Sequence, residues 1–149
     1  MKNLKKQITI ASTSTLLLIA GLSGALTSIA TPAKAAKGYN VRGHHYEVMS
    51  TESTKHYDQK GIGSWYDEDL VTANGEKFDK YAMTAASKEL PIGTKVRVTN
   101  LENHKSVVVR INDRGPFVKG RIIDLSYAGA KALGFEHKGT VPVEVTTVA

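Results

Sequence analysis

The sequence predicts a mainly β domain, folded as a closed barrel with one helical insertion. Two observations support this fold class. Short runs of β-branched residues alternate with polar residues between residue 61 and the C-terminus, and only one short stretch, near residue 130, has helical composition. Many short strands in one small domain protect their edges by closing into a barrel.

The predicted strands are defined by composition and alternation. Residues 61–66 form the first candidate strand. Residues 94–99 and 106–111 each alternate between apolar and polar side chains, and a polar connection joins them, so they predict an antiparallel pair. The last strand is expected over residues 141–145, where every second residue is valine.

One helix is predicted between Ser126 and Leu133. Ser126 can cap its start, the alanines inside it favour helix, and Gly134 stands where a glycine commonly ends one. Before the barrel, residues 38–43 have the composition of a hairpin within an otherwise polar segment.

The N-terminus predicts a secretory signal peptide. Lysines at positions 2, 5 and 6 precede an apolar stretch around residues 16–22, and small residues at 33–35 suit a cleavage site. A transmembrane anchor is the alternative, but serine and threonine on both sides keep the apolar run below the roughly 20 residues that span a bilayer. The chain therefore divides into a signal peptide (1–35), an N-terminal extension with a hairpin (36–60) and a barrel domain (61–149).

Charge and cysteine content limit the possible partners. The formal net charge of +6 falls to +2 when lysines 2, 5, 6 and 34 leave with the signal peptide, because no acid leaves with them. Nucleic-acid binding needs a concentrated basic surface, so we expect no nucleic-acid partner. The chain has no cysteine, hence no lipid-accepting thiol near the cleavage site. We expect a secreted monomer with no membrane anchor after signal cleavage.

The segment from Asn112 to Ser126, NDRGPFVKGRIIDLS, concentrates the polar chemistry of the chain. It holds two carboxylates, two arginines and a Gly-Pro turn beside β-branched runs. Residues 113–116 have the composition of a turn rather than of a strand. Binding and catalytic side chains concentrate on loops held by a rigid scaffold, so the sequence predicts the functional site here.

Four blocks of sequence share a distinctive order and spacing. They are GIGSWY at 61–66, TANGE at 72–76, LPIGTKVRVTN at 90–100 and the segment 107–127. Together they resemble the RlpA-like (rare lipoprotein A) family of double-psi β-barrels, over residues 38–145. The resemblance implies a six-stranded double-psi β-barrel with a short helix, an envelope location, and activity as a lytic transglycosylase of peptidoglycan.

The resemblance also implies particular site residues. Two carboxylates associated with activity in that family, in the NDRGPF and TANGE blocks, fall on Asp113 and Glu76. The family's histidine in the TAAH block falls on Ser87, because this chain reads TAAS. Expansins and the membrane-bound lytic transglycosylase A type place an important aspartate at the position that resembles Asp124. We expect these four residues to line one groove.

Glycosidic cleavage needs a proton for the leaving oxygen and stabilisation of an oxocarbenium-like transition state. A lytic transglycosylase can use one acid/base, because the sugar's own C6 hydroxyl attacks and closes a 1,6-anhydro ring. We assign the acid/base to Asp113, with Asp124 and Glu76 as further catalytic residues. Each also has a simpler explanation: an Asx turn for Asp113, a helix cap for Asp124 and an exposed turn residue for Glu76.

Substrate contacts are expected from Ser87, Arg114, Trp65 and Tyr66, with core packing as the alternative for one of the two aromatic residues. The loop after Tyr66 is short and acidic where the family often has a longer one, so one groove wall is expected to be lower. The histidines lack metal-ligand spacing, so we expect no metal, and no cofactor is implied.

The sequence thus predicts a secreted enzyme that binds and cleaves the glycan strands of peptidoglycan. The main alternative is a non-catalytic, expansin-like module that holds glycan in the same groove without cutting it, and Ser87 favours this alternative. A third class, a protease inhibitor or other protein-binding barrel, rests on the fold alone.

Overall fold

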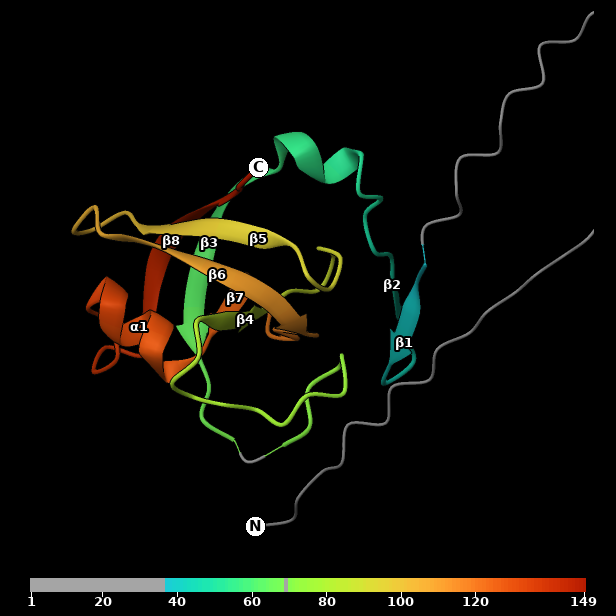
Figure 1. Cartoon of the computed structure of the whole chain (residues 1–149), viewed down its shortest axis with the longest axis horizontal. Helices are drawn as coiled ribbons and strands as arrows, with labels where there is room; N and C mark the ends of the chain where they lie inside the picture. The colour runs from blue at the N-terminus through green and yellow to red at the C-terminus, as the bar shows by residue number, and fades with distance from the viewer. Residues whose placement is uncertain (1–36, 69) are drawn as a thin grey trace, which may run out of the picture.

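The structure is a computed structural model that describes residues 37–68 and 70–149. Its centre is a closed barrel with the strand order β3-β7-β4-β6-β5-β8 (Figure 1). The strands are β3 (Asp58–Trp65), β4 (Thr84–Ala86), β5 (Lys95–Asn100), β6 (Ser106–Asp113), β7 (Arg121–Leu125) and β8 (Thr140–Thr147). The pairs β3–β7 and β4–β6 are parallel and the other neighbours are antiparallel. The predicted fold class, a six-stranded β-barrel with a short helix, is confirmed.

Alternating side chains of the long strands fill the barrel. Val96 and Val98 of β5 and Val143 and Val145 of β8 are at most 1% exposed, whereas their neighbours in sequence are more exposed. Burying a side chain of this size stabilises a fold by roughly 1.5–3 kcal/mol. The alternation in the sequence therefore identified these strands correctly.

The structure also contains strand residues that the sequence pattern did not reveal. The strand β3 begins at Asp58, before the barrel boundary expected at residue 61. The strand β6 continues through Asn112 and Asp113, which we had expected outside the strand, because β6 pairs with β4 as far as Asp113. All three residues of β4 are buried, so β4 has no alternation to detect.

The helix α1 (Tyr127–Leu133) lies where it was predicted. The Ser126 hydroxyl caps its start by accepting a hydrogen bond from the Gly129 amide at 3.2 Å. Gly134 ends it with a left-handed φ of 73°. Asp124 is a strand residue of β7 and does not cap this helix.

The predicted N-terminal hairpin consists of β1 (Tyr39–Val41) and β2 (His44–Tyr46), followed by the 3₁₀ helix η1 (Ser53–His56). It lies beside the barrel (Figure 1). The Tyr46 ring packs 5.2 Å from that of Phe117, which connects the hairpin to the turn after β6. The predicted signal peptide lies outside the described residues. In the part of the chain that the structure describes, no helix has the length and hydropathy needed to cross a membrane.

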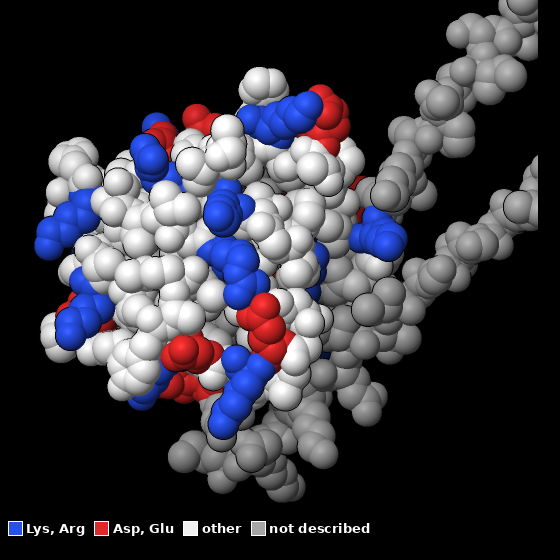
Figure 2. Space-filling model, in the orientation of Figure 1, with Lys and Arg blue, Asp and Glu red and all other residues white. Residues whose placement is uncertain are grey.

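Basic and acidic side chains are interspersed on the face of the barrel shown in Figure 2. Exposed ion pairs of the described residues include Arg110 with Glu76 and Lys138 with Glu102. Exposed pairs of this kind contribute at most about 1 kcal/mol each. Charge on this face is therefore mixed, with no single basic stripe.

Candidate active site

A β-bulge near the end of β6 sets the direction of Asp113. Ala85 pairs with Ile111 and the next residue, Ala86, pairs with Asp113, so Asn112 is the extra residue on β6. Strict alternation would put Asp113 on the inward face together with Ile111. The bulge instead turns Asp113 to the face of Ala86, on the outside of the barrel.

The same alanine brings the second aspartate into the site. Ala86 pairs with Asp124 of β7 on its other side, so Asp113 and Asp124 flank it on neighbouring strands and share one face. Burial is the main cause that raises the pKa of the nearby Tyr66 phenol, and Asp113 and then Asp124 raise it further. The Arg121 guanidinium lies 3.6 Å from the Asp124 carboxylate.

The Asp113 carboxylate is held by three hydrogen bonds. Its Oδ1 accepts from the amides of Ala73 and Arg114 at 2.9 and 2.8 Å. Its Oδ2 accepts from the Tyr66 hydroxyl at the longer distance of 3.3 Å. Asp113 is only 3% exposed, so the carboxylate has a fixed orientation, and Oδ2 is its less tightly held oxygen.

A turn in the β3–β4 connection covers this carboxylate. The Thr72 amide donates to the Glu76 carbonyl at 2.8 Å, and Gly75 has a left-handed φ of 88°, so residues 72–76 form a tight turn, as the turn explanation for Glu76 expected. The Asn74 amide donates to the Asn112 carbonyl at 3.2 Å. These bonds fix the turn above the end of β6 and place the Ala73 amide at Asp113.

Glu76 is ionised and paired with a cation. Its carboxylate accepts two hydrogen bonds from Arg110, at 3.0 and 2.9 Å, and one from Asn112 at 3.3 Å. Hydrogen bonds from Arg110, Asn112 and Asn74 lower the pKa of Glu76 to about 2. Glu76 therefore cannot donate a proton near neutral pH, and its contacts hold the end of β6.

The Glu76 pair predicts a small pH-dependent contribution to stability. Because the folded pKa is depressed from 4.5 to about 2, the stabilisation is present above pH 4.5 and is lost as pH falls towards 2. We expect Glu76→Gln to lower the unfolding midpoint slightly at pH 7, the difference disappearing between pH 4.5 and 2. Thermal unfolding of both proteins across this range measures it. A difference that stays constant down to pH 2 would mean that the carboxylate charge is not its source.

Arg114 is buried behind the site. It is 8% exposed, and its Nη1 donates to the carbonyls of Leu90 and Ser87 at 2.6 and 3.2 Å. The guanidinium lies over the Tyr39 ring of the hairpin, 5.3 Å from its centroid. Burial lowers the pKa of Arg114, while Tyr39 and Asp113 act in the opposite direction. These contacts give Arg114 a bracing role and argue against its expected contact with substrate.

Ser87 is buried beneath the site. It is 1% exposed, and its hydroxyl accepts a hydrogen bond from the Leu90 amide at 3.2 Å. Its own amide donates to the Asp113 carbonyl at 3.1 Å. Of the four residues expected to line one groove, Asp113 and Asp124 share a face, Glu76 adjoins it through Asn112, and Ser87 supports it from below.

The two adjacent aromatic residues have different surroundings. The Trp65 indole donates to the Glu136 carbonyl at 3.1 Å and packs against the hydrophobic core, so core packing applies to Trp65. Tyr66 stacks on Phe78 with ring centroids 4.5 Å apart and reaches Asp113. Nothing in the sequence singled out Phe78 as part of the site, because its contact with Tyr66 depends on the tertiary fold. Asn112 lies in the segment that was predicted to hold the site.

Comparison with known families gives a match over nearly all of the barrel. A family model described as lytic transglycolase matches residues 58–145, which is more than half of the chain. The chain belongs to the lytic transglycolase family. The match begins with β3, ends in β8 and leaves out the N-terminal hairpin.

Two curated relatives of this lytic transglycolase domain carry the same name. The endolytic peptidoglycan transglycosylase RlpA of Vibrio cholerae is 50% identical over 117 residues, covering 75% of this chain and 44% of the relative. Its namesake in Neisseria meningitidis serogroup B is 44% identical over 119 residues, covering 78% and 49%. The resemblance to the RlpA-like family is confirmed. The chain spans less than half the length of these relatives.

Solved structures share the fold of this lytic transglycolase domain. Streptomyces papain inhibitor superposes with a TM-score of 0.52 at 20% identity, over 62% of this chain and 96% of the inhibitor. The apo expansin of Clavibacter michiganensis gives a TM-score of 0.50 at 20% identity, over 62% and 51%. The superpositions indicate a common barrel. At an identity this low, they carry no information on function.

Proposed function

We propose that this protein is a lytic transglycosylase of the cell envelope that cleaves the glycan strands of peptidoglycan, with Asp113 as its acid/base. Family membership and the name shared by the relatives support the reaction. The single observation that carries the residue assignment is the convergence of Asp113 and Asp124 on one face through Ala86. The predicted signal peptide supports an extracytoplasmic location.

The chemistry requires one group that first donates and then accepts a proton. Asp113 Oδ2 gives a proton to the glycosidic oxygen as the bond from that oxygen to C1 of the sugar breaks. The C6 hydroxyl of the same sugar then bonds to C1, and its proton returns to the carboxylate. No water is consumed. Asp124 adds negative charge that favours the oxocarbenium-like transition state, and Glu76 positions the end of β6 through Arg110 and Asn112.

Substrate access requires a local opening, because Asp113 is 3% exposed. The Tyr66 hydroxyl is the only partner of Oδ2 found among the described residues, and its hydrogen bond is long. Oδ2 can keep this hydrogen bond and still face the substrate with its second lone pair, whereas Oδ1 already accepts from two backbone amides. A glycosidic oxygen would therefore approach Asp113 from the side of Tyr66.

A non-catalytic, glycan-binding module is the second candidate function. Ser87 favours it, because a serine hydroxyl does not ionise near neutral pH and here is engaged by the Leu90 amide. Incubation of the mature protein with purified glycan strands, followed by mass spectrometry, separates the candidates. Products with 1,6-anhydro ends are expected. New reducing ends would indicate hydrolysis, and binding without any product would support the second candidate.

Removal of the Tyr66 hydroxyl should slow turnover without weakening glycan binding. Tyr66→Phe keeps the stack on Phe78 and removes the hydrogen bond that orients Asp113 Oδ2. We expect kcat to fall about tenfold, the effect of roughly 1.4 kcal/mol, with KM unchanged. Tyr57→Phe is the matched control, since Tyr57 also donates to a carboxylate, that of Glu89 at 2.9 Å. If kcat falls equally in both variants, the Tyr66 hydroxyl has no specific role in orienting Asp113.

A further inference from the structure

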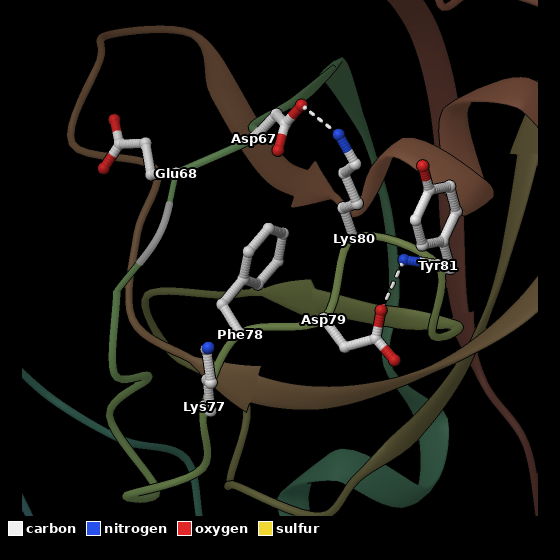
Figure 3. Close-up of a pocket in the computed structure, with 7 residues that line it drawn as sticks. All are labelled: Asp67, Glu68, Lys77, Phe78, Asp79, Lys80 and Tyr81. Atoms are coloured by element: carbon white, nitrogen blue, oxygen red, sulfur yellow. Dashed lines mark hydrogen bonds and ion pairs between the residues drawn. The ribbon is translucent and has the colours of Figure 1, made fainter.

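A pocket of about 430 Å³ lies between the two arms of the β3–β4 connection (Figure 3). The first arm contributes Asp67 and Glu68, and the second contributes residues 77–81. Lys80 Nζ and Asp67 Oδ2 lie 3.1 Å apart and join the two arms. This volume is within the range of small-molecule sites, which is about 300–1,000 Å³.

Tyr81 forms an open aromatic wall of this pocket. It is 70% exposed, which is high for a large apolar side chain. Its ring is held edge-on against Tyr127, at 6.4 Å and 88°, and Tyr127 packs in turn against Trp65 at 5.5 Å. The Asp79 carboxylate fixes the backbone by accepting from the Tyr81 amide at 2.8 Å. The Lys80 ammonium lies over the ring, 5.5 Å from its centroid. The ring is therefore oriented in advance, and most of the residue remains exposed.

The pocket shares a wall with the candidate acid. Phe78 lines the pocket and is buried at 8% exposure. Its ring stacks on Tyr66, whose hydroxyl donates to Asp113. Only the two stacked rings lie between the pocket and the Asp113 carboxylate. One extended ligand can therefore occupy the pocket and reach the carboxylate.

The lining suits an uncharged ligand with apolar faces and many hydroxyls. The rings of Phe78 and Tyr81 provide apolar surface, Asp67, Glu68 and Asp79 accept hydrogen bonds, and Lys80 donates them. Three carboxylates and two ammonium groups line the pocket, and one of each, Asp67 and Lys80, form an ion pair, so neither charge dominates it. A sugar ring has this combination, with C–H faces that pack on aromatic rings and hydroxyls at its rim.

We propose that this pocket is a saccharide subsite, which holds one sugar of the glycan chain while a neighbouring part of the same chain lies at Asp113. The assignment rests on the proposed function, because the glycan must be the ligand of the Asp113 site. It gives Tyr81, which the sequence did not single out, the role of the stacking platform. The short acidic loop after Tyr66, expected to lower one groove wall, supplies Asp67 and Glu68 to this subsite.

The test compares denuded glycan oligosaccharides of increasing length as substrates. In the wild-type protein, KM is expected to fall when the chain becomes long enough to occupy the pocket. In Tyr81→Ala, KM should no longer fall with oligosaccharide length, so KM for long oligosaccharides should be about tenfold higher than in the wild type. The loss in kcat/KM should come from KM, with kcat unchanged. Tyr81→Phe keeps the ring and should behave as wild type. His137→Ala, which removes a fully exposed ring outside the pocket, is the control and should leave the length dependence intact.

The outcomes separate the subsite from the proposed function. If the wild type cleaves glycan and Tyr81→Ala shows the same KM at every length, the subsite is wrong and the proposed function stands. If the wild type neither binds nor cleaves any oligosaccharide, the proposed function fails at the first measurement. Weaker binding of free stem peptide by Tyr81→Ala, with unchanged glycan kinetics, would make the pocket a peptide site and overturn the assignment. An unfolding midpoint lowered by Tyr81→Ala, together with a fall in kcat at every length, would also overturn it.

Discussion

Asp113→Asn should reduce glycan cleavage by a factor of a hundred or more while binding of glycan strands changes little. The amide has the shape of the carboxylate, and its oxygen can still accept from the Ala73 and Arg114 amides that now hold Oδ1. An amide cannot donate and recover a proton, and general acid–base catalysis typically contributes 10²–10⁴-fold. Release of 1,6-anhydro products measures cleavage, and titration calorimetry with denuded strands measures binding.

Asp124→Asn provides the comparison for this variant. Asp124 shares the face of Asp113 but makes none of the hydrogen bonds that orient the Asp113 carboxylate. We expect Asp124→Asn to retain more activity than Asp113→Asn. The reverse order would make Asp124 the principal acid/base, as its resemblance to the expansin position suggests. If both variants cleave glycan as fast as the wild type, the catalytic acid does not lie on this face.

The sequence predicted those parts of the barrel in which one face of a strand is buried. Val96, Val98, Val143 and Val145 fill the interior and alternate with more exposed neighbours, so local pattern and tertiary structure agree. The strand β4 escaped prediction because all of its residues are buried and it is only three residues long. Its place between β6 and β7 depends on pairing partners that are distant in sequence.

The candidate site was predictable only in part for the same reason. Family resemblance pointed to Asp113 and Asp124, but their convergence results from the pairing of Ala86 with both strands and from the bulge at Asn112. Composition placed residues 113–116 in a turn, and Arg114 was expected to contact substrate. Arg114 is buried instead, because the N-terminal hairpin packs over it through Tyr39. The pattern of a single segment does not reveal what another segment will cover.

Arg114→Ala should lower the free energy of unfolding by about 3 kcal/mol. The substitution leaves the Ser87 and Leu90 carbonyls without the Nη1 donor that now lies 3.2 and 2.6 Å away. It also removes the cation that packs on Tyr39 and ties the hairpin to the barrel. For a domain of this size the loss corresponds to a fall in the unfolding midpoint of roughly 10 °C or more. Thermal and urea unfolding measure it directly.

Two controls separate bracing by Arg114 from contact with substrate. Arg97→Ala makes the same chemical change at an exposed position of β5 and should leave the midpoint nearly unchanged, because exposed side chains contribute little to stability. Arg114→Lys keeps the charge but not the planar donor geometry, so its midpoint should lie between those of wild type and Arg114→Ala. If Arg114→Ala instead unfolds like the wild type and raises KM for glycan, the guanidinium reaches substrate, as the sequence suggested. The distances to Ser87 and Leu90 favour the loss of stability, since a guanidinium engaged by two buried carbonyls has to break those bonds before it can reach a sugar.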